Sequence, residues 1–170
     1  MNDMELYLYR HAEAADKKSK KYPQDADRPL TSGGIKCAKK CAKGMRKLGI
    51  DPEFILTSPY IRAHETAKLA SKSLGRKKLE LLNALQPGTP VPELIQEIKN
   101  KFDCDSLILV GHEPLLSTLA SVLLTGSDRL GIYLKKCGLC KLKIQKIRAG
   151  SCAELEWVLT PEQLSSLKQS

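Results

Sequence analysis

The strongest constraint on the fold is a continuous apolar run, Leu107-Ile108-Leu109-Val110, which ends at Gly111-His112. A run without polar alternation is typical of a strand that is buried on both faces, as in a parallel sheet covered by helices. Such a strand needs apolar elements packed above and below it. The run therefore predicts an α/β fold with this strand near the middle of the sheet.

Strand and helix patterns alternate along most of the chain. Two strands near the C-terminus follow each other as in a hairpin, so the sheet is expected to be mixed but mostly parallel. We expect a three-layer α/β sandwich with helices on both faces, and 170 residues is the usual size of one domain, here 1–170. The predicted strands are 5–9, 54–57, 78–82, 106–110, 141–147 and 152–159, and the predicted helices are 32–48, 60–74, 91–101, 115–124 and one that starts at 161.

The net charge is +9, and the densest basic run is Lys17-Lys18-Ser19-Lys20-Lys21, inside a long polar segment at 12–31. This run is either a solvated loop or an attractor for an anionic partner. No zinc-finger, KH or RRM pattern is present, so we do not expect nucleic-acid binding. The longest apolar stretch, 115–124, is too short to cross a bilayer, and the acidic start of the chain does not resemble a signal peptide. These features predict a cytoplasmic protein without a membrane partner.

The six cysteines are expected to be reduced thiols, as is usual inside cells. Cys37 and Cys41 lie one helical turn apart. Cys137 and Cys140 form a C-x-x-C pair, but no second pair with zinc-finger spacing accompanies it. We therefore predict no metal site and no cofactor.

Two of the chain's three histidines, His11 and His112, follow directly after predicted strands. Arg10 precedes the first of them, and Arg62 lies shortly after a third strand. Because ligands of open α/β sheets bind at the carboxyl ends of the strands, we expect these four side chains to converge on one edge. The remaining histidine, His64, is expected to be structural.

This set of side chains suits a phosphoryl group. A guanidinium binds phosphate oxygens as a bidentate fork, and helices that begin after Ser58 and Gly111 would present free N–H groups to an anion. A neutral imidazole is a nucleophile toward phosphorus. No aspartate cluster suggests a magnesium site, so the cationic groups would be side chains.

Several motifs resemble those of the histidine phosphatase superfamily, the phosphoglycerate-mutase-like proteins. Leu8-Tyr9-Arg10-His11-Ala12-Glu13 is similar to the Arg-His-Gly signature, with Ala12 in place of the usual glycine. Closest in size and motifs are the short SixA-type protein phosphohistidine phosphatases. The other matching segments are Ser58 to Ala63 with Glu65-Thr66-Ala67, Gly111-His112, Asp27 to Thr31 with Gly34, Leu85 to Gly88, and Trp157 with Thr160-Pro161.

The resemblance implies roles for these residues. His11 would be the nucleophile that forms a phosphohistidine intermediate. Arg10 and Arg62 would bind the phosphoryl oxygens, and His112 would donate a hydrogen bond to them. Further candidates for substrate contact are Arg28 at the pocket rim and Ser58.

The general acid is not evident. Larger members of the superfamily carry a glutamate near residues 82–85, where this chain has Asn83-Ala84-Leu85. Glu13 and Glu113 are the carboxylates beside the motifs, and either could instead be exposed and idle. The imidazole that leaves a phosphohistidine can already be protonated, whereas an alkyl ester must expel an alkoxide and needs proton transfer. The sequence therefore favours P–N bonds.

The leading hypothesis is a metal-independent phosphatase that removes phosphate from phosphohistidine on a protein of the phosphotransfer-domain type. Inorganic phosphate would be the product, and we expect a monomer. One alternative is a small-molecule phosphomonoesterase or mutase on the same scaffold. A second alternative is a non-catalytic phosphate- or phosphoprotein-binding module.

Overall fold

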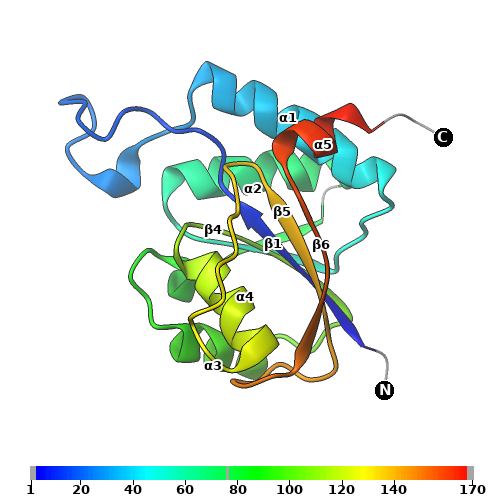
Figure 1. Ribbon diagram of the computed structural model, residues 1–170. Helices are drawn as coiled ribbons and strands as arrows, with labels where there is room; N and C mark the ends of the chain where they lie inside the picture. The colour runs from blue at the N-terminus through cyan, green and yellow to red at the C-terminus, as the bar shows by residue number, and fades with distance from the viewer. Residues whose placement is uncertain (1–2, 76, 168–170) are drawn as a thin grey trace.

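The computed structural model describes residues 3–75 and 77–167, and over these residues it has a six-stranded sheet between two layers of helices (Figure 1). The strand order is β3-β2-β4-β1-β5-β6. The first four strands in this order are parallel, and β5 is antiparallel to both of its neighbours. The strands are β1 (Met4–Arg10), β2 (Phe54–Thr57), β3 (Lys78–Leu81), β4 (Ser106–Gly111), β5 (Leu139–Ile144) and β6 (Ala153–Leu159).

Helices cover both faces of the sheet, which confirms the predicted fold class. One face carries α1 (Ser32–Lys47), α2 (Ile61–Ser73) and α5 (Pro161–Ser166), and the other carries α3 (Val91–Lys101) and α4 (Leu115–Thr125) (Figure 1). Two short 3₁₀ turns, η1 (Asp25–Asp27) and η2 (Asn83–Leu85), lie in the connections. None of the helices in the described part of the chain is long and apolar enough to cross a membrane.

The apolar run that predicted the fold is β4, and all of its residues are buried. Successive side chains of a strand point to opposite faces. Leu107 and Leu109 therefore join the core beneath α3 and α4, while Ile108 and Val110 join the core beneath α1 and α2. A strand in this position must be apolar on both faces, which explains why its sequence does not alternate.

The register of β1 against β4 determines where the site forms. Arg10 is paired with Gly111, and the N–H of His11 donates to the carbonyl of Gly111 over 3.0 Å. His11 and His112 therefore leave the sheet side by side. On the other side of β4, the N–H of Ser58 donates to the carbonyl of Val110, also over 3.0 Å.

Most boundaries lie within one residue of the sequence-based prediction, and two segments differ by more. Strand β5 was predicted at 141–147 but occupies Leu139–Ile144, because its last residue already pairs with Met4, where β1 begins. The segment 12–31 was predicted as a loop, and it is folded back on itself by η1 and by a bridge between Ala14 and Leu30. The capping box predicted at Thr160 and Gln163 is present at the start of α5.

Candidate active site

A cavity of about 360 Å³ opens at the carboxyl ends of β1 and β4. It brings together the four residues that the sequence predicted to converge, together with Arg28 from the segment after β1. A carboxylate that the prediction did not include, Asp25, lies among them. The residues that define its chemistry are Arg10, His11, Asp25, Arg28, Arg62 and His112.

His11 is held as a neutral imidazole with a defined tautomer. His11 is only 8% exposed, and its Nδ1 donates to the carbonyl of Ala12 over 2.6 Å. Its Nε2 accepts a hydrogen bond from Nε of Arg62 over 3.3 Å, so the lone pair is on Nε2. Burial lowers the pKa of His11 to about 4, helped by the positive charges of Arg62 and Arg10 and opposed by the bond to Ala12. Neutral Nε2 can therefore act as a nucleophile near pH 7.

Arg62 sits in the first turn of α2 and is almost fully buried at 4% exposure. Its Nη2 donates to Oδ2 of Asp25 over 2.8 Å, and its Nη1 donates to the backbone carbonyl of Asp25 over 2.6 Å. Arg28 makes a further ion pair with Asp25 over 2.7 Å. Burial raises the pKa of the Asp25 carboxyl, but the hydrogen bonds and charges of the two arginines outweigh it and lower that pKa overall.

Arg10 is anchored by the segment that precedes β5. Its Nη1 donates to the carbonyl of Leu134 over 2.9 Å, and its backbone N–H donates to the carbonyl of Gly138 over 3.1 Å. Its Nε is buried and makes no hydrogen bond to any residue that the structure describes. Arg10 lines the pocket, so this donor is a candidate contact for an oxyanion.

His112 is oriented from behind by Ser58. The hydroxyl of Ser58 lies 2.8 Å from Nε2 of His112 and accepts the backbone N–H of Tyr60 over 3.3 Å. When the Ser58 hydroxyl donates to Nε2, the imidazole proton of His112 is on Nδ1. That Nδ1 is buried and has no partner within the described chain, so it can donate to a bound anion. Burial lowers the pKa of His112 to about 3. The neighbouring His11 and the positive charge of Arg62 lower this pKa further.

Glu65 and Thr66, from the motif after Arg62, support the site without entering it. The hydroxyl of Thr66 accepts the N–H of Ala12 over 3.1 Å and donates to the carbonyl of Arg62 over 2.7 Å. The carboxylate of Glu65 accepts the N–H of Leu30 over 2.8 Å. These contacts lock the segment that carries His11 onto α2, which explains the residue types in this motif.

Two of the predicted site residues do not line the pocket. Glu13 turns toward α1, where its Oε2 accepts the hydroxyl of Thr31 over 3.0 Å, because the chain reverses after Ala12 to reach the bridge at Ala14. Ser58 lies behind His112, where its hydroxyl contacts Nε2 of the imidazole, and it is not among the pocket-lining residues. His64, predicted to be structural, is also outside the pocket lining.

The other predicted carboxylate, Glu113, does line the pocket. One of its oxygens accepts the N–H of Ser117 over 3.1 Å at the start of α4, and the second oxygen makes no hydrogen bond to another described residue. Lys17 of the basic run and Lys136 complete the charged rim. The sequence did not indicate Asp25 and Lys136 as site residues, because no regular spacing connects their positions to the motifs.

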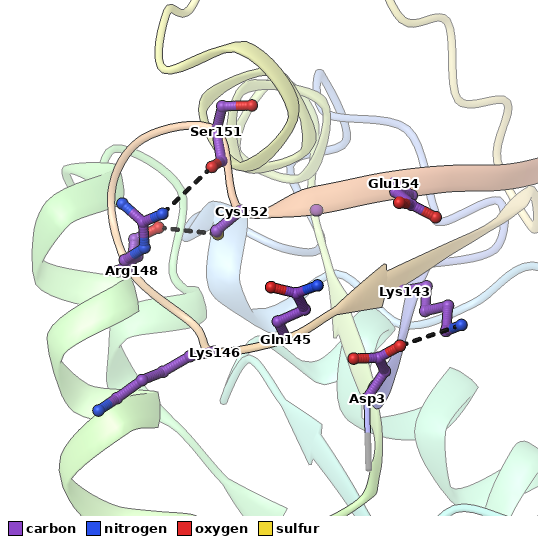
Figure 2. Close-up of a pocket in the computed structure, with 9 residues that line it drawn as sticks. Asp3, Lys143, Gln145, Lys146, Arg148, Ser151, Cys152 and Glu154 are labelled. Carbon is purple, nitrogen blue, oxygen red and sulfur yellow. Dashed lines mark hydrogen bonds and ion pairs between the residues drawn. The ribbon is translucent and has the colours of Figure 1, made fainter. Parts of the chain in front are cut away.

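A second cavity of about 360 Å³ lies at the opposite end of the sheet, near the start of β1 and the connection from β5 to β6 (Figure 2). Its lining is charged but contains no histidine, and Lys143 is paired with Asp3 over 3.0 Å. Its two nucleophilic residue types, Ser151 and Cys152, donate their side-chain protons to the backbone carbonyls of Leu124 and Arg148. The chemistry is therefore concentrated at the His11 pocket.

The geometry of the His11 pocket agrees with the comparison to known proteins. The family model described as histidine phosphatase superfamily (branch 1) matches residues 6–86, a span that includes Arg10, His11 and Arg62. The chain belongs to the histidine phosphatase superfamily. The resemblance seen in the sequence motifs is thereby confirmed.

Similar proteins cover most of the chain. An uncharacterised protein of Picosynechococcus sp. is 34% identical over 166 residues, which are 95% of this chain and 99% of that protein. Phosphohistidine phosphatase SixA of Escherichia coli (strain K12) is 28% identical over 128 residues, or 72% of this chain and 76% of that protein. Among solved structures, the protein histidine phosphatase SixA complexed with tungstate superposes with a TM-score of 0.79 at 24% identity, over 95% of this chain and 99% of that one.

Proposed function

We propose that this phosphatase removes phosphate from phosphohistidine on a protein, through a covalent phosphohistidine intermediate on His11. One observation carries the proposal. Nδ1 of His11 donates to the Ala12 carbonyl, so the lone pair of the neutral imidazole is on Nε2, beside the guanidinium of Arg62. A nucleophile with a fixed tautomer and an adjacent phosphate-binding group is the arrangement that phosphoryl transfer through an enzyme intermediate requires.

The reaction proceeds in two displacements. Nε2 of His11 forms a bond to phosphorus, and the P–N bond of the substrate breaks with its electron pair going to the leaving imidazole. Water then attacks the phosphorus of phospho-His11, which releases inorganic phosphate and restores the neutral ring. Arg10 and Arg62 bind the equatorial oxygens, and Nδ1–H of His112 donates to one of them.

Among the described residues that line the pocket, only one carboxylate is a candidate general acid, which favours P–N bonds in the proposal. Asp25 is ionised because two arginines lower the pKa of its carboxyl, so it has no proton to give near pH 7. Glu113 is the remaining carboxylate among the described residues that line the pocket. A leaving imidazole is easily protonated from solvent and needs no enzyme acid, whereas an alkoxide does.

A protein substrate is supported by the charged rim. The exposed Lys17 and Lys136 both line the pocket, and Lys18, Lys20 and Lys21 are exposed on the same segment as Lys17. Positive charge around a pocket raises the association rate with an acidic partner. We also expect residues 1–170 to act as one domain, as a monomer, in the cytoplasm, and catalysis to use no metal.

The test compares phosphate release from a phosphohistidine-labelled phosphotransfer domain with release from an alkyl phosphate ester, both in EDTA. Wild type, His11→Ala and the matched control His64→Ala are assayed together. We expect fast release from the protein, slow release from the ester, loss of both in His11→Ala and retention of both in His64→Ala. A quench in alkaline detergent, in which phosphohistidine is stable, should trap 32P-labelled enzyme in wild type but not in His11→Ala.

The other outcomes point to the alternatives. Ester turnover that equals or exceeds turnover of the protein, still dependent on His11, would indicate a small-molecule phosphatase. Tight phosphate binding without release from either substrate would indicate a binding module.

A further inference from the structure

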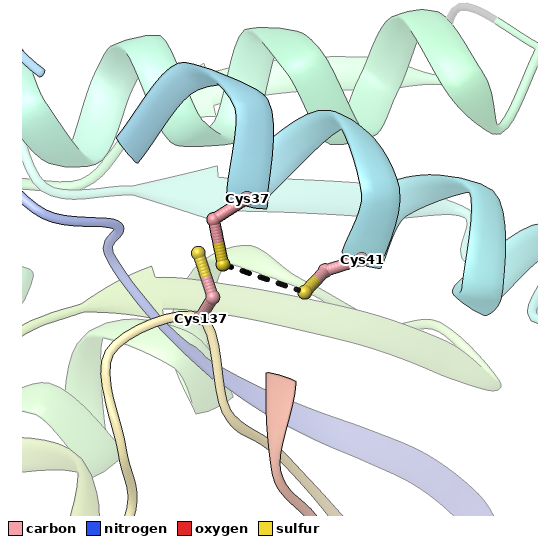
Figure 3. A group of neighbouring side chains, drawn as sticks. All are labelled: Cys37, Cys41 and Cys137. Atoms are coloured by element: carbon pink, nitrogen blue, oxygen red, sulfur yellow. Dashed lines mark hydrogen bonds between the residues drawn. The ribbon is translucent and has the colours of Figure 1, made fainter. Parts of the chain in front are cut away.

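Three thiols from distant parts of the sequence converge beside β1 (Figure 3). Cys37 and Cys41 lie on α1, and Cys137 lies in the connection that leads into β5. The three sulfur atoms are all within 4.8 Å of one another, and those of Cys37 and Cys41 are 4.0 Å apart. Cys41 and Cys137 are buried and Cys37 is half-buried.

The C-x-x-C pair seen in the sequence does not form this cluster. Cys137 belongs to the core beneath α1 and α2, whereas Cys140 belongs to the core beneath α3 and α4, on the other face of the sheet. The fold therefore pairs Cys137 with the cysteines of α1. Sequence spacing alone did not indicate this combination.

We propose that Cys37, Cys41 and Cys137 form a binding site for a thiophilic d¹⁰ metal ion, Zn²⁺ or Cu⁺. A metal–sulfur bond of about 2.3 Å holds thiolate sulfurs roughly 3.8–4.0 Å apart, close to the separation already present on α1. An all-sulfur ligand set selects such ions over Mg²⁺, Ca²⁺ or Mn²⁺. A disulfide between two of these residues would need their sulfurs to approach to about 2.05 Å, and it would leave the third thiol unused.

A second, independent observation supports a bound cation. The side chain of Tyr9 is fully buried, and its hydroxyl makes no hydrogen bond to any residue in the described part of the chain. This hydroxyl lies beside the thiol of Cys137. A neutral thiol is a weak acceptor, but a metal-bound thiolate is a charged one, so coordination would give the buried hydroxyl the acceptor it lacks. Hydrogen bonds from neighbouring groups to the metal-binding side chains are a regular feature of metal sites.

Binding would exchange protons for the ion. The thiols must lose their protons to coordinate, so up to three protons pass to solvent for each ion bound. No oxidant or reductant takes part. The bound ion would tie α1 to the connection before β5, which supports the active site: the N–H of Cys137 donates to the carbonyl of Arg10 over 3.1 Å and to that of His11 over 3.4 Å.

The test is a titration of chelator-treated, fully reduced protein under anaerobic conditions, with Zn²⁺ in one arm and Cu⁺ in the other. Each ion competes with a chromophoric chelator, and Cd²⁺ serves as a probe of sulfur-to-metal charge-transfer absorption. We expect one ion per chain, with the two arms deciding which ion binds more tightly. The expected melting temperature is higher with the ion than without it, because only the folded chain assembles the site.

Matched variants separate this cluster from the remaining thiols. Cys37→Ala should lower the affinity by more than about 100-fold and abolish the Cd²⁺ band, because losing a ligand costs more than losing an outer contact. Alanine is the best helix former and Cys37 is half-buried, so this variant should fold, as circular dichroism would confirm. Cys104→Ala and Cys152→Ala, also half-buried, should bind as wild type does.

Tyr9→Phe removes only the hydroxyl and should weaken binding by about tenfold. The proposal is overturned if neither ion binds at one per chain, or if Cys37→Ala binds with unchanged affinity. Either result would be independent of phosphatase activity, so it leaves the proposed function unaffected.

Discussion

Asp25 occupies the edge of the Arg62 guanidinium that a phosphoryl group needs. Nη2 of Arg62 donates to Oδ2 of Asp25 over 2.8 Å, and Nη1 donates to the backbone carbonyl of the same residue over 2.6 Å. These two N–H groups form the fork that binds phosphate oxygens bidentately. The Asp25 carboxylate and the substrate therefore compete for one cationic group, and Asp25 also keeps that group in place between turnovers.

Asp25→Asn should tighten the binding of inorganic phosphate. The substitution removes a negative charge that repels the phosphate anion. Repulsion between two such charges weakens phosphate binding by about tenfold, so its removal should strengthen binding by the same factor. We expect the inhibition constant of phosphate and the KM to fall, while kcat falls too because Arg62 is less well ordered. Competitive inhibition kinetics measures both effects.

Asp27→Asn is the matched control because Asp27 lies in the same 3₁₀ turn but does not line the pocket. It removes the same charge from the same turn. If the two variants bind phosphate equally, general electrostatics rather than the Arg62 contact would account for the effect.

Glu113→Gln should separate ester hydrolysis from phosphohistidine hydrolysis. Glu113 has one carboxylate oxygen free in the pocket, and general acid catalysis contributes about 100- to 10,000-fold for a poor leaving group. We expect turnover of p-nitrophenyl phosphate to change little, turnover of an alkyl phosphate to fall at least tenfold, and phosphohistidine turnover to stay constant.

Glu13→Gln serves as the comparison, since that carboxylate bonds to Thr31 outside the pocket. An alkyl phosphate rate that is insensitive to Glu113→Gln would mean that this carboxylate donates no proton.

The neutral state of His11 makes the stability of the fold depend on pH. Its pKa is about 4 in the folded chain against an ordinary value of 6.5, so between these values the unfolded chain binds a proton that the folded chain does not. The free energy of unfolding therefore falls as pH falls through this window, by roughly 2–3 kcal/mol. His11→Asn should show a smaller decrease between pH 7 and pH 4.5 in urea unfolding experiments. Parallel curves for the two proteins would contradict a depressed pKa at this residue.

The layers and the core of the site could be predicted because they depend on local patterns. The unbroken apolar run at 107–110 required a strand covered on both faces, and parallel strands bring the residues that follow them to one edge. Arg10 is the last residue of β1, and His11 and His112 follow directly after β1 and β4. Their convergence needed no knowledge of loop conformation.

The remaining parts of the site depend on how long connections fold, which periodicity does not record. Asp25 reaches Arg62 because a 3₁₀ turn and a bridge fold the segment 12–31 back over α2. Glu13 is one residue beyond the signature, and the same reversal turns it away. The cysteine cluster likewise joins a helix to a connection almost a hundred residues further along the sequence, and only the tertiary fold determines that contact.

Ser58→Ala should slow catalysis through His112. Without the hydroxyl 2.8 Å from Nε2, the imidazole is free to place its proton on either nitrogen, and Nδ1–H is no longer directed at the phosphoryl oxygens. We expect kcat to fall by about tenfold or more, up to the roughly 100- to 1000-fold that loss of an oxyanion donor costs. Nitrogen NMR of labelled histidine should report the changed tautomer. A lower kcat with the wild-type tautomer would indicate a different role for Ser58.

Gly44→Ala should destabilise the packing of α5 on α1. A Cβ at Gly44 would clash with the backbone carbonyl of Leu164, which cannot rotate away, so α5 would have to move. Overpacking typically costs about 1–3 kcal/mol, which outweighs the gain of about 1 kcal/mol from replacing glycine in a helix. Gly33→Ala on the same helix meets only side-chain atoms at 3.5 Å or more and should be neutral or stabilising. Urea unfolding of both variants distinguishes the two effects, and equal stability would show that α5 adjusts without cost.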